Sequence, residues 1–291
     1  MLDLKLDRAP TEPRPAATLL LLRDGDEGLE IFCVVRNAAS RFLGGAVVFP
    51  GGKVDAGDAS PELVSHARGL PASRDGFSTN DDELRAFAVA ALRESLEEAA
   101  LLPLSEGALS DAELGALRER LAAGASFASL LGERGLVVDL SSLHPFARWV
   151  TPEAEARRYD TRFFLCRAPE GQTGAHDDGE TTASFWATPA AVLARFDRGE
   201  IALAPPTHRC LELLAPVANV DAALAVAATV GLLPICPRLV EVPHEGGTTL
   251  ALVLPGDAEH TVPEARVPGA SRYVLRDGKF VPEDGPKPSA T

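Results

Sequence analysis

Residues 93–98 read Arg-Glu-Ser-Leu-Glu-Glu and place three carboxylates within one turn of a predicted helix. Glu94, Glu97 and Glu98 stand at positions i, i+3 and i+4, so their side chains share one helix face. Like charges at this spacing repel each other by about 0.2–0.5 kcal/mol per pair on an exposed helix. A divalent cation would turn that repulsion into attraction, and carboxylate oxygens suit Mg²⁺ or Mn²⁺. The stretch predicts either a metal site or a solvated acidic face.

The remainder of this predicted helix favours a fixed position for the carboxylates. Asn80 can cap its start, and Glu83 three residues later completes a box-like arrangement. Apolar residues recur on the opposite face with a period of 3.6 residues, so we expect the helix to pack inward and to hold its carboxylates outward. The apolar positions are Ala88, Val89, Leu92, Leu96 and Ala99.

A glycine-rich segment precedes this helix in the chain. Residues 49–58 read Phe-Pro-Gly-Gly-Lys-Val-Asp-Ala-Gly-Asp and follow the apolar run 45–49, which predicts a strand and then a turn. Glycine allows a backbone to approach a ligand closely, and an exposed Gly51 carbonyl could join a metal shell. Alone, such a segment is typical of an ordinary turn. Its combination with residues 93–98 is far more specific.

Together the two segments resemble the Nudix box, G-x5-E-x7-R-E-U-x-E-E-x-G-U, in which U is an aliphatic residue. Three positions depart from it, because Asp58 stands for Glu, Ser95 for an aliphatic residue and Ala100 for Gly. Residues 59–92 also replace the seven that separate the two halves of the box. The matching residues are Gly52, Arg93, Glu94, Glu97, Glu98 and Leu101.

The long insertion is compatible with an intact site. Loop-closure cost grows logarithmically with length, so a connection about five times longer costs about 1–2 kcal/mol if its ends stay close. Residues 60–63, Ser-Pro-Glu-Leu, predict a short helix with Ser60 as N-cap and Pro61 in the first position, and Gly69 can end it. Asp58 is the weaker point, because its side chain is shorter than that of Glu.

The chain also resembles one subgroup of this family, the peroxisomal-type coenzyme A diphosphatases, which carry a long insertion in the box. Their motif L-L-T-x-R-S-x3-R-x3-G-x3-F-P-G-G is matched in spacing by Arg36, Arg41, Gly45 and residues 49–52, whereas Asn37 replaces its Ser. The resemblance extends over about residues 14–214. It implies hydrolysis of CoA or acyl-CoA to 3′,5′-ADP and (acyl-)phosphopantetheine. Arg36, Arg41 and Gly52 are then the expected substrate contacts, since arginine suits phosphate oxygens.

The resemblance also assigns roles within the predicted site. Mg²⁺ or Mn²⁺ would be held by Glu94, Glu97, Glu98 and the Gly51 carbonyl, clamping a pyrophosphate and activating a water. Arg93 would orient a carboxylate through a salt bridge. The candidate general bases are Glu97, Glu98 and Glu180, the last in the acidic run 177–180.

Two other function classes stay open at this point. One is a Nudix enzyme for another nucleoside diphosphate derivative, such as a dinucleotide, a nucleotide sugar or a nucleoside triphosphate. The other is a non-catalytic Nudix-like binding module, in which Asp58 and Ala100 mark a decayed box. The intact carboxylates argue against the binding module.

The amino-acid composition argues against some classes of binding partner. The formal net charge of −14 over 291 residues argues against binding of nucleic acid, which needs a basic face. Apolar runs are too short to span a membrane, and four scattered cysteines predict buried reduced thiols and a cytoplasmic protein. We expect a small-molecule partner, no nucleic acid, no membrane, and a possible homodimer.

The element pattern predicts an α/β fold, a Nudix-type α/β/α sandwich with a mixed sheet and helical insertions. Strands are expected at residues 15–22, 29–36, 144–150, 161–167 and 183–187, and helices at 110–123, 189–196 and 206–214. Residues 1–215 form the expected Nudix domain, with insertions at about 59–80 and 105–135 that could cap the substrate. Residues 216–291 form a β-rich C-terminal extension, packed on this domain or at a dimer interface, with a hairpin at Asp277-Gly278.

Overall fold

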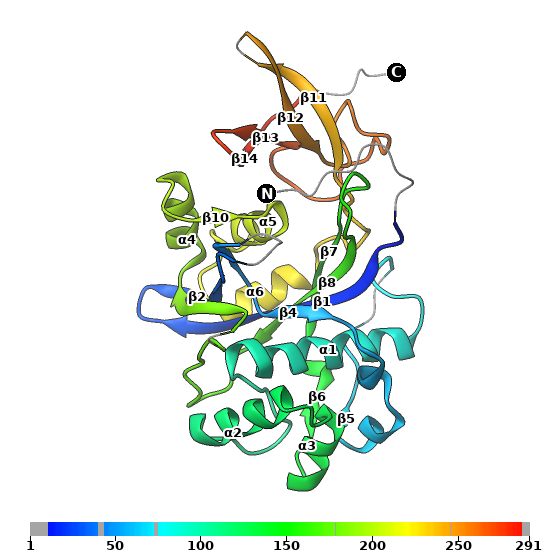
Figure 1. The fold of residues 1–291 in the computed structure, drawn as a ribbon, viewed down its shortest axis with the longest axis vertical. Helices are drawn as coiled ribbons and strands as arrows, with labels where there is room; N and C mark the ends of the chain where they lie inside the picture. The colour runs from blue at the N-terminus through cyan, green and yellow to red at the C-terminus, as the bar shows by residue number, and fades with distance from the viewer. Residues whose placement is uncertain (1–10, 40–43, 73–74, 178, 245, 287–291) are drawn as a thin grey trace.

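The computed structural model describes residues 11–39, 44–72, 75–177, 179–244 and 246–286. Its centre is a mixed, curled sheet in the order β10-β3-β2-β1-β8-β7, with β4 paired to β1 and β9 paired to β2. Strands β1 and β8 run parallel, whereas β1 and β2 form an antiparallel hairpin (Figure 1). The strands are β1 (Arg14–Gly25), β2 (Gly28–Arg36), β3 (Ala46–Val48), β4 (Gly51–Lys53), β7 (His144–Val150), β8 (Tyr159–Arg167), β9 (Thr181–Ala187) and β10 (Ala202–Leu203).

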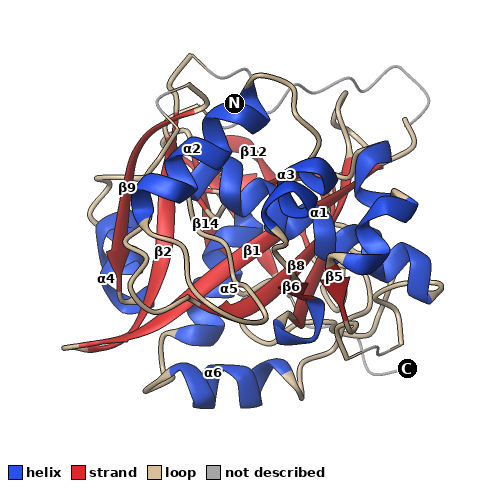
Figure 2. Ribbon diagram, turned by 90° about the horizontal axis from the view of Figure 1, so that it is seen from below, coloured by secondary structure: helices blue, strands red, loops and turns tan. Residues whose placement is uncertain are grey.

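Helices cover both faces of this sheet, as the alternation along its strands requires. In β1 the buried residues alternate: Leu19 and Leu21 pack with helix α1 (Asp81–Ala99), and Leu20 and Leu22 pack with the helices of the opposite face. Figure 2 shows this sheet with helices on either side. The opposite face is covered by α4 (Pro189–Asp197), α5 (Pro205–Leu214) and α6 (Val220–Ala227). The prediction of an α/β/α sandwich with a mixed sheet is confirmed.

The two insertions lie together on the α1 side of the sheet. A 3₁₀ turn (Ala56–Ala59) leads into the first insertion, which contains a second 3₁₀ turn (Pro61–Ser65) and β5 (Ala67–Arg68). Strand β5 pairs with β6 (Val138–Asp139), which follows the second insertion. The second contains α2 (Asp111–Ala122) and α3 (Phe127–Arg134), whose leucines join the core under α1. The apolar residues of these segments pack in the same core cluster as α1, and the expected cap over the substrate stays a prediction.

Two arginines, Arg148 half-buried and Arg162 buried, fix the end of the first insertion. The Arg148 Nη1 donates to the Gly76 carbonyl at 2.6 Å, and the Arg162 Nε donates to the Phe77 carbonyl. Asp160 pairs with both arginines, at 2.7 Å and 2.5 Å. Because these contacts hold the chain directly before α1, the helix starts in a defined place despite the long insertion.

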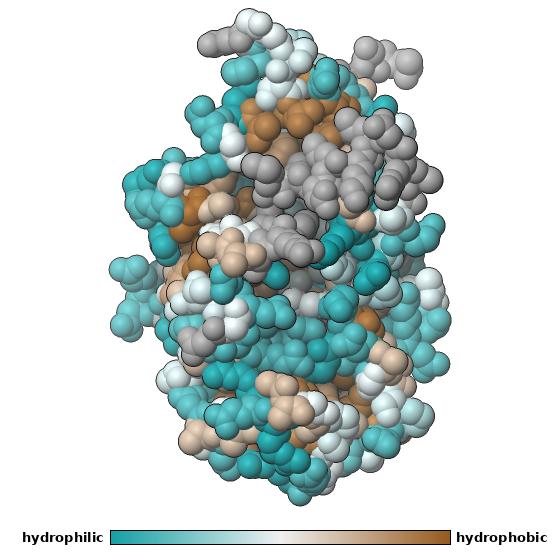
Figure 3. Space-filling view, in the orientation of Figure 1, coloured by the Kyte–Doolittle hydropathy of each residue, from teal (hydrophilic) through white to brown (hydrophobic). Residues whose placement is uncertain are grey.

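The C-terminal segment forms a second sheet, which Figure 1 shows at the end of the molecule opposite α2 and α3. Its strands are β11 (Arg238–His244), β12 (Gly247–Val253), β13 (Arg272–Arg276) and β14 (Lys279–Glu283). The predicted hairpin is present, with positive φ at Asp277 and Gly278. Helix α6 was not predicted. In the view of Figure 3, apolar residues gather over this sheet and hydrophilic ones over the level of α1.

Two further predictions concern the cysteines and membrane association. Cys33, Cys166 and Cys210 are buried, Cys236 is half-buried, and all four are free thiols as predicted. Across the described residues, we find no helix of the length and apolarity that a bilayer crossing requires.

Candidate active site

Helix α1 carries the acidic triplet, and its start is fixed as the sequence indicates. The Asn80 side chain accepts from the Glu83 N–H at 2.9 Å. The reciprocal contact differs from the prediction, because Glu83 accepts from Thr79 rather than from the Asn80 backbone. This capping satisfies backbone donors that would otherwise stay unpaired.

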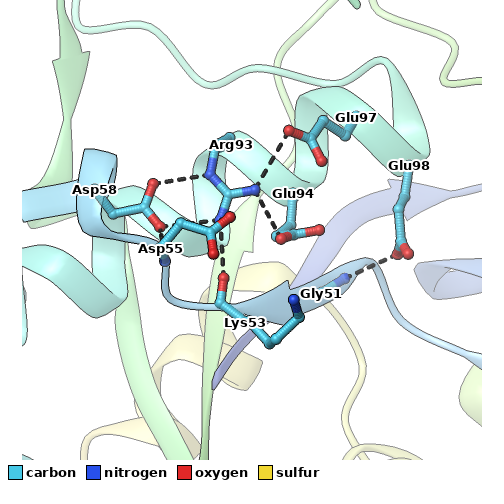
Figure 4. A network of polar contacts seen from close by, with 8 residues as sticks. All are labelled: Gly51, Lys53, Asp55, Asp58, Arg93, Glu94, Glu97 and Glu98. Carbon is cyan, nitrogen blue, oxygen red and sulfur yellow. Dashed lines mark hydrogen bonds and ion pairs between the residues drawn. The ribbon is translucent and has the colours of Figure 1, made fainter. Parts of the chain in front are cut away.

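Arg93 is the hub of the site, as Figure 4 shows. Its Nε and Nη2 donate to the two carboxylate oxygens of Asp58 at 2.8 and 2.9 Å, and its Nη2 also donates to the Lys53 carbonyl at 2.9 Å. Its Nη1 donates to Glu94 at 2.8 Å and to Glu97 at 3.3 Å. One buried guanidinium therefore connects the glycine-rich segment to the acidic face.

The three departures from the family pattern all find a place in this geometry. Asp58 reaches Arg93 with both oxygens, since the 3₁₀ turn at Ala56–Ala59 brings it close. Ser95, fully buried, donates to the Leu101 carbonyl at 2.8 Å and so fixes the end of α1. Ala100 has φ 49°, a left-handed conformation that costs a non-glycine residue about 1 kcal/mol, which explains a glycine at this position of the box.

Two of the three carboxylates are buried, so the expectation of an outward face is wrong for Glu94 and Glu98. Glu94 is 9% and Glu98 5% exposed, because the glycine-rich segment forms strand β4 and packs beside α1 rather than turning away. The Glu98 carboxylate accepts from the Gly51 N–H at 3.0 Å (Figure 4). Only Glu97 keeps a partly exposed side chain, at 36%.

Burial makes these carboxylates hard to ionise. It raises the pKa of Glu94 to about 7, against the opposing effect of Arg93, and the pKa of Glu98 to about 8, against the opposing hydrogen bond from Gly51. Burial also raises the pKa of Glu97. Buried oxygen ligands of this kind suit a hard divalent cation, which would favour their ionised form.

The present hydrogen bonds divide the three carboxylates between two donors. In the described part of the chain, no three acidic, histidine or cysteine side chains converge in a way that could hold a metal ion. Arg93 holds Glu94 and Glu97, whereas the Gly51 N–H holds Glu98. The carboxylate oxygens are donors that suit a divalent cation, and side-chain rotations would be needed to bring them together.

Gly52 makes room for Glu94. A methyl group on Gly52 would lie 2.5 Å from the Glu94 carboxyl carbon, so only glycine leaves this carboxylate where it is. The close approach of backbone to a functional group is the reason for glycine here, since the φ of Gly52 is not positive.

Gly52→Ala is expected to reduce activity about tenfold to a hundredfold while changing the free energy of unfolding by less than about 1 kcal/mol. The clash falls on a flexible carboxylate, which can move aside without disturbing the fold but leaves its functional position. Kinetics and urea unfolding of the variant check this. Gly57→Ala is the matched control, because a methyl group there meets nothing within 4 Å. Full activity of Gly52→Ala would contradict the placement of Glu94 in the site.

The acidic face lines a large cleft, and none of its lining residues comes from either insertion. Its volume is about 740 Å³, in the range of sites for medium-sized ligands. Arg36, Lys53 and Arg157 bring positive charge to it. Its other lining residues come from β1, β7, β8, the start of α5 and the C-terminal extension, and include Thr18, Trp149, Thr161, Phe163, Pro205 and Leu252.

The cleft brings together most of the residues that the sequence singled out. Arg36, Gly51, Gly52, Glu94, Glu97, Glu98 and Glu180 all line it. The Nε of Arg36 is buried and has no hydrogen-bond partner among the described residues, which leaves a donor for a ligand. Glu180 lies on a loop shaped by Asp177, which accepts from the backbone N–H groups of Glu180 and Thr181. Arg41 lies outside the described residues.

Sequence reasoning missed several lining residues. Lys53 directly follows the glycine pair, and its position there was a usable signal. Arg157 stands in a turn between β7 and β8 without any pattern that marks it, and Trp149, Phe163 and Leu252 look like ordinary core residues. Their place in the cleft follows only from the packing of distant segments.

Comparison with known proteins assigns the family. The family model described as the NUDT19 Nudix domain matches residues 12–213. The chain belongs to the Nudix hydrolase family. A crystal structure of a Nudix hydrolase from Alicyclobacillus acidocaldarius is similar, with a TM-score of 0.63 and 32% identity over 74% of this chain and 96% of that one.

Curated relatives point to one branch of the family. The acyl-coenzyme A diphosphatase NUDT19 of Gallus gallus is 32% identical over 61% of this chain and 58% of its own length. The protein of the same name from Homo sapiens is 28% identical over 73% of this chain and 64% of its own length. The similarity therefore spans less than two thirds of either relative.

Proposed function

We propose that this protein hydrolyses the pyrophosphate bond of CoA or acyl-CoA with the help of Mg²⁺ or Mn²⁺, releasing 3′,5′-ADP and (acyl-)phosphopantetheine. The observation that carries the proposal is that buried Glu94 and Glu98 line the same cleft as the cationic side chain of Arg36. The names of the curated relatives support CoA-type substrates. Four free thiols, three of them buried, fit a reducing compartment such as the cytoplasm.

The residues of the cleft have distinct tasks in this proposal. Glu94, Glu97 and Glu98, with the Gly51 carbonyl, would hold the cation, which supplies charge neutralisation at the pyrophosphate and lowers the pKa of a water. Arg93 positions Glu94 and Glu97 through its Nη1 and is itself held by Asp58. Glu180 would take the proton of the attacking water, since it lines the same cleft as Glu98. The water adds to one phosphorus, and the other phosphate leaves with its bridging oxygen.

A panel of substrates tests the substrate class. Purified protein with Mg²⁺ or Mn²⁺ is offered CoA, acyl-CoA, NADH, ADP-ribose, nucleotide sugars and deoxynucleoside triphosphates, and the products are identified by mass spectrometry. We expect the highest kcat/KM for CoA species. A higher value for another member would keep the pyrophosphatase and discard CoA as the substrate, and binding without cleavage would favour a binding module.

Arg36→Ala is expected to raise KM for CoA about tenfold and to raise it much less for 3′-dephospho-CoA. The variant removes a charged donor that we assign to the 3′-phosphate, and hydrogen bonds to charged groups contribute about 1.5–3 kcal/mol. Steady-state kinetics on both substrates measure the difference. Arg14→Ala, at an exposed arginine outside the cleft, is the control. Equal changes for both substrates would detach Arg36 from that phosphate.

A further inference from the structure

The lining of the cleft includes two chemically different groups of residues. The acidic face of α1, strand β4 and Arg36 form the first group. The second group is apolar and consists of Trp149, Phe163, Pro237 and Leu252, which we call the apolar wall; polar and charged residues such as Thr151, Glu155 and Arg157 also line the cleft. Trp149, Phe163 and Leu252 are 3%, 6% and 3% exposed and belong to one continuous core cluster.

Half of the apolar wall comes from the C-terminal extension. In β12 the side chains alternate between the two faces of the second sheet. Leu252 and Leu254 join the cluster that contains Trp149, whereas Ala251 and Val253 join a separate cluster on the other face. The face with Leu252 is therefore the one turned toward the central sheet and the cleft.

The extension is held in this position by specific contacts. The buried Arg209 of α5 donates to the Pro268 and Ala270 carbonyls at 2.8 and 2.7 Å. Residue Ile235 exchanges backbone hydrogen bonds with the β7 strand, at 2.9 Å to the Val150 N–H and 2.8 Å to the Arg148 carbonyl. The wall is thus part of a fixed structure and needs no rearrangement to meet a ligand.

We propose that the apolar wall binds the acyl chain of an acyl-CoA, so that residues 216–291 supply part of the substrate site. This inference rests on the proposed function, which places the pyrophosphate on the acidic face. The adenosine end carries a further phosphate and requires cations, which the four wall residues do not offer. The acyl chain is the apolar part of such a substrate, and carbon surfaces bury it favourably.

Leu252→Ala tests this assignment through a ratio. We expect the preference for decanoyl-CoA over free CoA, as kcat/KM, to fall about tenfold, since small changes in apolar pockets alter selectivity by this order. Val253→Ala is the matched control on the same strand, because Val253 is equally buried but belongs to the other face. The ratio should be unchanged there. An unchanged ratio in Leu252→Ala, which means equal losses for decanoyl-CoA and CoA, would overturn the proposal. An equal fall of the ratio in both variants would also overturn it.

A binding measurement covers the case in which Leu252→Ala fails to fold. Trp149 and Trp186 are the two tryptophans of the chain, so Trp186→Phe leaves Trp149 as the single indole reporter in the wall. With EDTA to prevent turnover, decanoyl-CoA should change its fluorescence saturably, and free CoA should change it far less. No difference between the two ligands would overturn the proposal. Cleavage by the wild-type protein tests the proposed function independently of the apolar wall. That function fails if the wild-type protein cleaves no CoA species.

Discussion

Glu98→Gln is expected to lower kcat/KM for CoA by about 10²–10³-fold or more while leaving the fold intact. The substitution removes a negative charge that we assign to cation binding, and loss of one such electrostatic contact costs about 2.7–4 kcal/mol of transition-state stabilisation. The amide oxygen of Gln can still accept from the Gly51 N–H, so thermal unfolding without added metal should change little. Glu97→Gln should act in the same direction, and higher Mg²⁺ should partly restore both variants.

Asp82→Asn is the control for loss of one charge from the same helix, because Asp82 is exposed and lies outside the cleft. Its activity should stay within about twofold of wild type, as expected for a surface position. Activity of Glu98→Gln and Glu97→Gln within threefold of wild type would remove the acidic face from the mechanism.

Arg93→Met is expected to lower the free energy of unfolding by about 3–5 kcal/mol. It leaves Asp58, 2% exposed, buried without its cation, and an uncompensated buried charge is costly. The double variant Arg93→Met/Asp58→Leu removes both charges and should be more stable than Arg93→Met alone. It should still be inactive, because Glu94 and Glu97 lose the donor that positions them.

Urea unfolding at neutral pH measures these differences, with Arg120→Met as the control. Arg120 makes a bidentate ion pair with Glu133 at 2.6 and 2.9 Å, but both side chains are exposed, so its loss should cost about 1 kcal/mol or less. The single variant Asp58→Leu completes the comparison. If the double variant loses as much free energy of unfolding as the two single variants lose together, Arg93 and Asp58 do not act as a pair.

Local signals predicted much of the fold. The predicted caps at Ser60 and Asn80 are present because each depends on side chains within three residues of the helix start. Strand alternation predicted β1, β2, β7 and β8, and the central α/β/α sandwich follows from their apolar faces. These features depend on neighbouring residues, which a sequence shows directly.

The predictions for features that depend on contacts between distant segments were wrong or were not made. The burial of Glu94 and Glu98 depends on β4 pairing with β1, since residues 51–53 look like a turn in the sequence. The place of the insertions depends on β5 pairing with β6, about 70 residues apart in the chain. The contribution of Leu252 to the cleft depends on which face of the C-terminal sheet meets the core. No local pattern carries that information.

Product analysis of a single reaction tests the central claim most directly. CoA is incubated with Mg²⁺ and either the wild-type protein or Glu98→Gln, and the products are identified by mass spectrometry. The account predicts stoichiometric 3′,5′-ADP and phosphopantetheine from the wild type, no cleavage with EDTA, and strongly reduced cleavage with the variant. Intact CoA after incubation of the wild-type protein with either Mg²⁺ or Mn²⁺ would contradict it.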